Sequence, residues 1–170
     1  MPDPSRLAFF VAAALALLVV PGPAVLYIVT QSIDGGRRAG LASTAGIFTG
    51  TLVHVAAATA GLSALLASSA LAFDVVKYLG AAYLIVVGLR RLVGRERAAA
   101  QPLAAPRALR LRYRQGIVVN LLNPKTALFF LAFLPQFVDP ARGAVAGQTL
   151  VLGCLLAALG LASDCVYALL

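Results

Sequence analysis

Long hydrophobic stretches alternate with short polar segments along the chain, and this alternation is the main structural signal in the sequence. It predicts five apolar helices, over residues 7–30, 40–66, 71–92, 116–138 and 144–170. Each stretch has about the 20 residues that a helix needs to cross a hydrocarbon core about 30 Å thick, at about 1.5 Å per residue. The pattern therefore predicts an all-α fold in which residues 1–170 form a single polytopic transmembrane bundle.

The composition agrees with a membrane location and excludes a soluble globular domain. Hydrophobic residues make up 61% of the 170 residues and charged residues only 12%, and the mean hydropathy is +0.93. Soluble domains average about 25% charged and about 45–50% apolar residues. The first stretch has no basic cluster before it and no small-residue cleavage motif after it. We therefore expect a retained helix rather than a cleaved signal peptide.

Basic residues predict how the bundle is oriented. The net charge is +8, and eight arginines lie between Arg90 and Arg114. Because six of them lie in the segment over residues 93–115, we expect a cytoplasmic loop beside anionic lipid headgroups rather than a nucleic-acid surface. The turn between the first two stretches carries Arg37 and Arg38 and falls on the same side. This arrangement places the N-terminus outside and the C-terminus of this chain inside.

Two of the apolar stretches are interrupted by proline. The first contains Pro21-Gly22-Pro23 and the fourth contains Asn123-Pro124-Lys125. A proline inside a helix removes one backbone donor and costs roughly 3 kcal/mol, and in lipid the freed carbonyl has no water to turn to. Lys125 adds about 2.5–3.5 kcal/mol for a charge near the bilayer midplane. Paired broken helices in oppositely directed halves are typical of the substrate site of an inverted-repeat transporter.

The candidate substrate-binding residues lie at these two breaks: Pro21, Gly22, Pro23, Asn120, Asn123, Pro124 and Lys125. Our hypothesis is that Lys125 and a new helix N-terminus after Pro23 or Pro124 attract the carboxylate of an amino acid. Carbonyls freed by the prolines, over residues 17–19 and 120–121, would accept from its ammonium group. The two asparagines would add orientation.

Two further polar residues are candidates for proton coupling. His54 falls near the middle of the second stretch and Asp164 late in the fifth. A histidine at mid-membrane can carry a proton near neutral pH, and a buried, hydrogen-bonded structural histidine is the alternative. For Asp164 the alternatives are a group facing the bundle interior and an ordinary interfacial carboxylate.

The second stretch also contains Gly46-x-x-x-Gly50, a motif that permits close helix approach. We expect it to serve packing within the chain. A homodimer seam at the same glycines is the alternative.

Several ordered motifs extend beyond the breaks. They are Gly35-Gly36-Arg37-Arg38-Ala39-Gly40, Lys77-Tyr78-Leu79-Gly80-Ala81-Ala82-Tyr83-Leu84, the run from Tyr113 to Gly116, Asn120-x-x-Asn123-Pro124-Lys125, and Gln136-Phe137-Val138. Together with Pro21-Gly22-Pro23 they resemble the LysE/RhtB family of amino-acid exporters over nearly the whole chain. The resemblance implies a secondary transporter, not an enzyme, that needs no cofactor. It would export an amino acid or derivative across the cytoplasmic (inner) membrane, as an antiporter driven by the proton-motive force.

Members of that family usually have a sixth helix, so the resemblance implies a three-plus-three inverted repeat whose last helix is missing here. A truncated, non-transporting paralogue is one alternative function. A metal-ion exporter of related architecture is another, and it would need grouped ligands from His54, Asp164 and the two cysteines.

Overall fold

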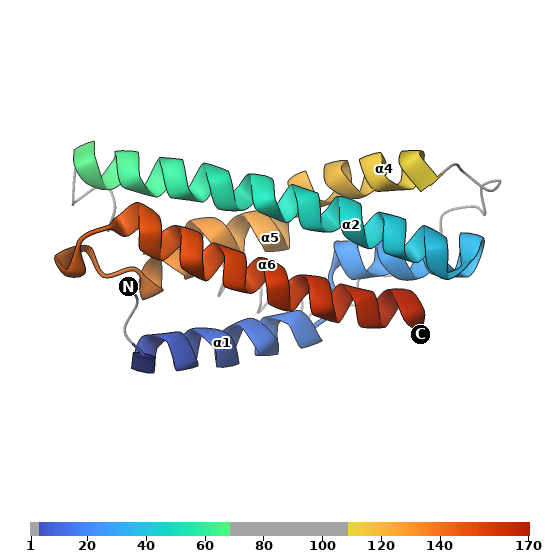
Figure 1. Cartoon of the computed structure of the whole chain (residues 1–170), viewed down its shortest axis with the longest axis horizontal. Coiled ribbons are helices and arrows are strands. Elements are labelled where there is room, and N and C mark those ends of the chain that lie inside the picture. Colours follow the sequence, from blue (N-terminus) through green and yellow to red (C-terminus); the bar gives the residue numbers. More distant parts are fainter. Residues whose placement is uncertain (1–3, 69–108) are drawn as a thin grey trace, which may run out of the picture.

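The computed structural model describes residues 4–68 and 109–170, and within these ranges the chain is helical, with no strand. The predicted helix over residues 71–92 and the predicted loop up to residue 108 lie outside the described residues. Figure 1 shows the helices running side by side along the long axis of the molecule. The prediction of an all-α fold therefore holds for the residues that are described.

The first helix breaks at the prolines, as the sequence predicts. Helix α1 covers Pro4–Val19 and helix α2 covers Pro23–Ser68. Because Pro21 and Pro23 have no amide proton, neither can donate to the carbonyl four residues earlier. Helical hydrogen bonding resumes when the Leu26 amide donates to the Gly22 carbonyl at 3.1 Å.

Helix α2 is two helices joined at one residue. Gly36 has φ 73° and ψ 179°, and the helix is regular on either side of it. The positive φ favours glycine because it lacks a Cβ. The chain reverses direction at this point (Figure 1). The reversal lies in the predicted turn, but the turn itself needs only this single non-helical residue.

The second break lies in the fourth predicted stretch. Helix α4 covers Leu109–Leu121 and helix α5 covers Pro124–Leu128. The two segments, with the second one continued to Phe137, meet at 47°. The prediction that residues 109–115 belong to a loop is wrong, because α4 begins at Leu109. Arginine density suggested a loop there, but these arginines sit on helical backbone.

Beyond α5 the chain winds irregularly before the last helix. A π-helical turn, η1, covers Phe129–Phe133, and 3₁₀ turns η2 and η3 cover Leu134–Phe137 and Pro140–Arg142. Helix α6 then covers Val145–Leu169.

The described residues hold fewer complete spans than the five that the sequence predicts. Pro23–Gly61 and Val145–Leu169 are long and apolar enough to cross a membrane, and the bent pair makes a third if it is one span. The apolar part of α1, Arg6–Val19, is shorter. These findings show a helical membrane protein, while the five-helix repeat stays a prediction.

Glycines bring α2 and α4 into close contact. A Cβ at Gly50 would lie 2.9 Å from the Asn120 Cβ, and one at Gly116 would lie 2.6 Å from the Ser43 carbonyl oxygen. A Cβ at Gly46 would overlap the Tyr113 carbonyl. The expectation that Gly46 and Gly50 serve packing within the chain is confirmed, since α4 covers both.

Each half of the first broken helix packs against one half of the second. Helix α1 contacts the segment after the second break, where the Phe10 ring lies 5.9 Å from Phe129 and 5.1 Å from Phe137. The part of α2 before Gly36 contacts α4, where the Tyr27 hydroxyl donates to the Arg112 carbonyl at 2.9 Å. The two breaks therefore lie between two packed pairs of half-helices.

Candidate functional site

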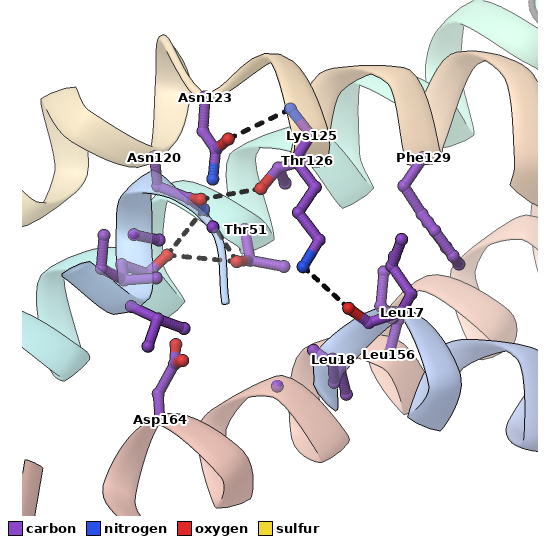
Figure 2. Close-up of a pocket in the computed structure, with 15 residues that line it drawn as sticks. Leu17, Leu18, Thr51, Asn120, Asn123, Lys125, Thr126, Phe129, Leu156 and Asp164 are labelled. Carbon is purple, nitrogen blue, oxygen red and sulfur yellow. Dashed lines mark hydrogen bonds between the residues drawn. The ribbon is translucent and has the colours of Figure 1, made fainter. Parts of the chain in front are cut away.

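A cavity of about 80 Å³ lies where the two breaks face α6. Residues from α1, α2, α4, α5 and α6 line it, and Figure 2 shows their side chains converging on it. Since a single water needs only about 10–15 Å³, the cavity has room for several waters or a small organic molecule. Its charged lining residues, among those described, are Lys125 and Asp164.

Lys125 joins one break to the other. Its ammonium group donates to the Leu17 carbonyl at 2.7 Å and also to the Val20 carbonyl, and Figure 2 shows the side chain reaching α1. The Leu17 carbonyl is the one that would accept from residue 21 in an unbroken helix, but Pro21 has no proton to give. The lysine thus satisfies an acceptor that the proline frees.

This geometry corrects one part of the substrate hypothesis. The freed carbonyls of residues 17–19 were expected to accept from the ammonium group of a bound amino acid. In the structure the Leu17 carbonyl already accepts from Lys125. An intramolecular ammonium group therefore occupies the position predicted for that of the substrate.

Gly22 provides the space that Lys125 needs. A Cβ built at Gly22 would lie 3.0 Å from the Lys125 Cδ and 3.7 Å from its Nζ. Few real Cβ contacts are that close to a side-chain carbon, so any other residue at position 22 would push the lysine aside. Gly22 is buried and lines the cavity.

Asn123 caps the helix that carries Lys125. Its Oδ1 accepts from the Lys125 backbone amide at 3.1 Å, which is how an N-cap asparagine satisfies a first-turn donor. The side chain is 3% exposed and lines the cavity. The Asn-Pro pair thus ends α4, starts α5 and sets the direction of the lysine.

Asn120 uses its amide to join α2 to the second break. The amide nitrogen donates to the Ile47 carbonyl at 2.9 Å and to the Thr51 hydroxyl at 2.8 Å, and the amide oxygen accepts from Thr126 at 3.0 Å. The residue lines the cavity, but both donors are used within the protein. Its place in the network is that of a positioning group.

His54 lies behind the second break and outside the cavity lining. Its Nε2–H donates to the Asn120 carbonyl at 3.2 Å, and its ring stacks on Phe130 with centroids 5.8 Å apart. Pro124, four residues on, cannot donate to that carbonyl, which accepts from the Asn123 backbone amide at 3.0 Å as well. This geometry matches the structural histidine of the two alternatives.

Asp164 faces the cavity from α6. The residue is 9% exposed, and Figure 2 shows its carboxylate pointing toward the two breaks. Within the described residues, no hydrogen bond or salt bridge to this carboxylate is found. This orientation agrees with the interior-facing alternative.

The three prolines of the predicted site lie at its edge. Pro21, Pro23 and Pro124 are exposed and do not line the cavity. They act through the backbone, by opening the helices and freeing carbonyls. Residues that the sequence did not single out complete the lining, among them Leu18, Thr51, Thr126, Phe129, Leu156 and Gly160.

Arg112 is an exception to the predicted contact with lipid headgroups. It is 2% exposed, and its Nη1 donates to the Gln31 carbonyl at 2.8 Å. Its Nε has no partner among the described residues. Gly35 leaves space for the guanidinium, because a Cβ there would overlap it. The prediction of a lipid contact is therefore wrong for this arginine.

A metal site finds no support in the described part of the chain. Residues 4–68 and 109–170 contain no group of three or more His, Cys, Asp or Glu side chains that could hold an ion.

The comparison with known families decides which class of protein this is. The model of the LysE type translocator family matches residues 15–170. The chain belongs to the LysE type translocator family. LysE type translocators are membrane transporters and not enzymes, in agreement with the predicted class. No solved structure gives a significant match to the chain.

Among the relatives of this LysE type translocator is the homoserine/homoserine lactone efflux protein of Salmonella typhimurium. It is 36% identical over 137 residues, which are 81% of this chain and 66% of that protein. The leucine efflux protein of Salmonella choleraesuis is 30% identical over 134 residues, 76% of this chain and 62% of that protein. The aligned part therefore spans just under two thirds of the length of these relatives.

Proposed function

We propose that this protein exports a small amino acid or close derivative across the cytoplasmic membrane, coupled to the proton-motive force. The observation that carries the proposal is the cavity between the two breaks, with the Lys125 ammonium on one wall and the Asp164 carboxylate on another. A zwitterionic amino acid brings one charge of each sign. In a water-poor cavity both must be compensated, because an unpaired buried charge is costly.

The proposed binding mode keeps Lys125 as the partner of the substrate carboxylate and changes the partner of the substrate ammonium group. The Asp164 carboxylate, which no described residue hydrogen-bonds, accepts from the ammonium group of the substrate. Lys125 binds the substrate carboxylate. The first turn of α2 adds positive potential there, since Ala24 and Val25 line the cavity at the N-terminus of that helix.

This mode links binding to the first break. Lys125 donates to the Leu17 and Val20 carbonyls in the structure. A substrate carboxylate would compete with these carbonyls for the same ammonium group, and the charged acceptor forms the stronger hydrogen bond. Binding therefore loosens the contact between α5 and the end of α1.

We assign proton coupling to Asp164 rather than to His54. The Asp164 carboxylate can bind the substrate ammonium group or a proton, but not both at once. An antiporter needs such mutually exclusive binding of substrate and proton. His54 is less suited, because its Nε2–H is engaged by the Asn120 carbonyl and the ring does not reach the cavity.

The names of the relatives agree with this substrate class. Homoserine and leucine, named for two of them, are amino acids with uncharged side chains. The orientation with the N-terminus outside, the inverted repeat and the possible homodimer remain parts of the proposal that rest on the sequence.

The test is a feeding assay with dipeptides in cells that express the chain. Intracellular hydrolysis releases toxic amounts of one amino acid, and an exporter restores growth and releases that amino acid into the medium. We expect protection against at least one neutral amino acid, and loss of that protection in Asp164→Asn.

Asp34→Asn is the matched control, because Asp34 lies at the end of the first part of α2, away from the cavity lining. It should export normally. Equal export by wild type and Asp164→Asn, at equal amounts in the membrane, would contradict the proposed role of Asp164.

A further inference from the structure

We infer that Gly160 determines which substrate side chains the cavity accepts, and that it selects amino acids with small or medium apolar side chains. The inference rests on the proposed export function and deepens it. It concerns a residue that makes no polar contact and that the breaks themselves do not include.

Gly160 belongs to a stripe of cavity-lining residues on α6. Leu156, Gly160 and Asp164 follow one another at intervals of four residues and all line the cavity. Residues at this spacing lie on one face of a helix, about 6 Å apart along its axis. The stripe therefore presents a carboxylate, an open position and an apolar side chain in succession.

A substrate held by Asp164 has its side chain close to this open position. The ammonium group and the side chain are bonded to the same carbon, so a substrate held by Asp164 has its side chain within about one helical turn. With its carboxylate toward Lys125, the side chain extends toward Gly160 and Leu156. The wall there is completed by Leu17, Leu18 and Phe129.

The charges in the cavity define the substrate class. Beyond Lys125 and Asp164, no other charged residue lines it within the described part of the chain. A basic or acidic substrate side chain would thus lie against leucine and phenylalanine without a counter-charge, which is unfavourable. An uncharged side chain fits this wall.

Packing does not require a glycine at position 160. Among the described residues, the nearest neighbour of a Cβ built there would be the Leu18 Cδ2 at 3.8 Å, an ordinary van der Waals distance. Gly153 on the same helix differs, since its Cβ would lie 3.0 Å from Val55. A glycine in a helix interior lowers stability relative to alanine, so the useful property of Gly160 is the space that it leaves in the cavity.

The test compares substrates of different size in wild type, Gly160→Ala and Gly160→Leu. Alanine and leucine are supplied as dipeptides, and the amino acid released to the medium is measured. We expect Gly160→Ala to reduce leucine export about tenfold relative to alanine export, since one methyl group in an apolar pocket commonly changes discrimination by that factor or more. Gly160→Leu should reduce export of both.

Gly147→Ala is the matched control on α6, because its Cβ would lie 3.8 Å from Ala144 and outside the cavity lining. Stabilisation of the purified protein by leucine and by alanine, measured as a shift in melting temperature, gives a readout that does not need transport. If Gly160→Ala leaves the ratio of leucine export to alanine export unchanged, this inference is overturned and the proposed function is not affected. A wild type that neither exports nor is stabilised by any amino acid would overturn the proposed function, and this inference with it.

Discussion

Lys125 and Leu17 are separated by 108 residues in the chain, yet the lysine ammonium group donates to the leucine carbonyl at 2.7 Å. Each of them is a local defect in a membrane helix, one a charge and the other an acceptor without a donor. Together they satisfy each other. At the second break the Asn120 carbonyl accepts from the Asn123 backbone amide at 3.0 Å, and His54 adds a second donor at 3.2 Å.

Replacing Lys125 with methionine should abolish export and leave membrane insertion intact. Methionine keeps an apolar stem of similar length but cannot bind a substrate carboxylate or the Leu17 carbonyl. Insertion should not suffer, since removal of a charge favours the membrane. Export and the amount of protein in the membrane are measured together, with exposed Arg114→Gln as the basic-residue control. Normal export by Lys125→Met would rule out its role at the site.

Gly22→Ala should reduce export by roughly tenfold. The new Cβ would lie 3.0 Å from the Lys125 Cδ, and a small displacement of a positioned group in a binding site commonly costs that much or more. Initial export rates report the effect. Gly61→Ala adds the same methyl group at a position where no atom of the described residues lies within 4 Å, and it should behave like wild type. Equal rates in both variants would show that the lysine does not need its present position.

His54→Gln and His54→Leu separate a structural role from a proton-carrying one. Glutamine retains an N–H donor for the Asn120 carbonyl, whereas leucine does not. We expect the pH dependence of export to be the same in wild type and His54→Gln. His54→Leu should lower stability by about 1 kcal/mol, the usual net value of one hydrogen bond. If the pH dependence of export changes in His54→Gln, His54 takes part in proton transfer after all.

Gly116→Ala should destabilise the protein by about 1–3 kcal/mol, the usual range for overpacking. Its Cβ would meet the Ser43 carbonyl oxygen at 2.6 Å and force α2 and α4 apart. The melting temperature in detergent measures the change, with Gly147→Ala for comparison. An unchanged melting temperature in Gly116→Ala would contradict this close contact between α2 and α4.

The sequence predicts the breaks well because proline acts locally. Pro21 and Pro124 remove a helical hydrogen bond whatever surrounds them, and Asn123 is a strong N-cap residue for the helix that follows. The sequence does not predict which groups donate to the freed carbonyls. That Lys125 reaches Leu17 depends on how α1 packs against α5, which no local pattern contains.

The distribution of charged residues gives a wrong prediction where a charged side chain is buried. The arginines before Gly116 predicted a loop among lipid headgroups, yet Arg112 is buried on α4 beside Gly35. Its position depends on a glycine far away in the sequence. The sequence does not single out Gly160 and Thr51, because small residues are common in this chain. Only their position in the cavity lining distinguishes them from the others.

The packing of half-helix against half-helix has a mechanical consequence. Phe10 ties α1 to the segment after the second break, and Tyr27 ties the first part of α2 to α4. Rotation of one pair relative to the other would bend the chain at Gly22 and Asn123 and leave the contacts within each pair unchanged. A molecule held in the cavity would lie beside both of these bends, since Gly22 and Asn123 line it.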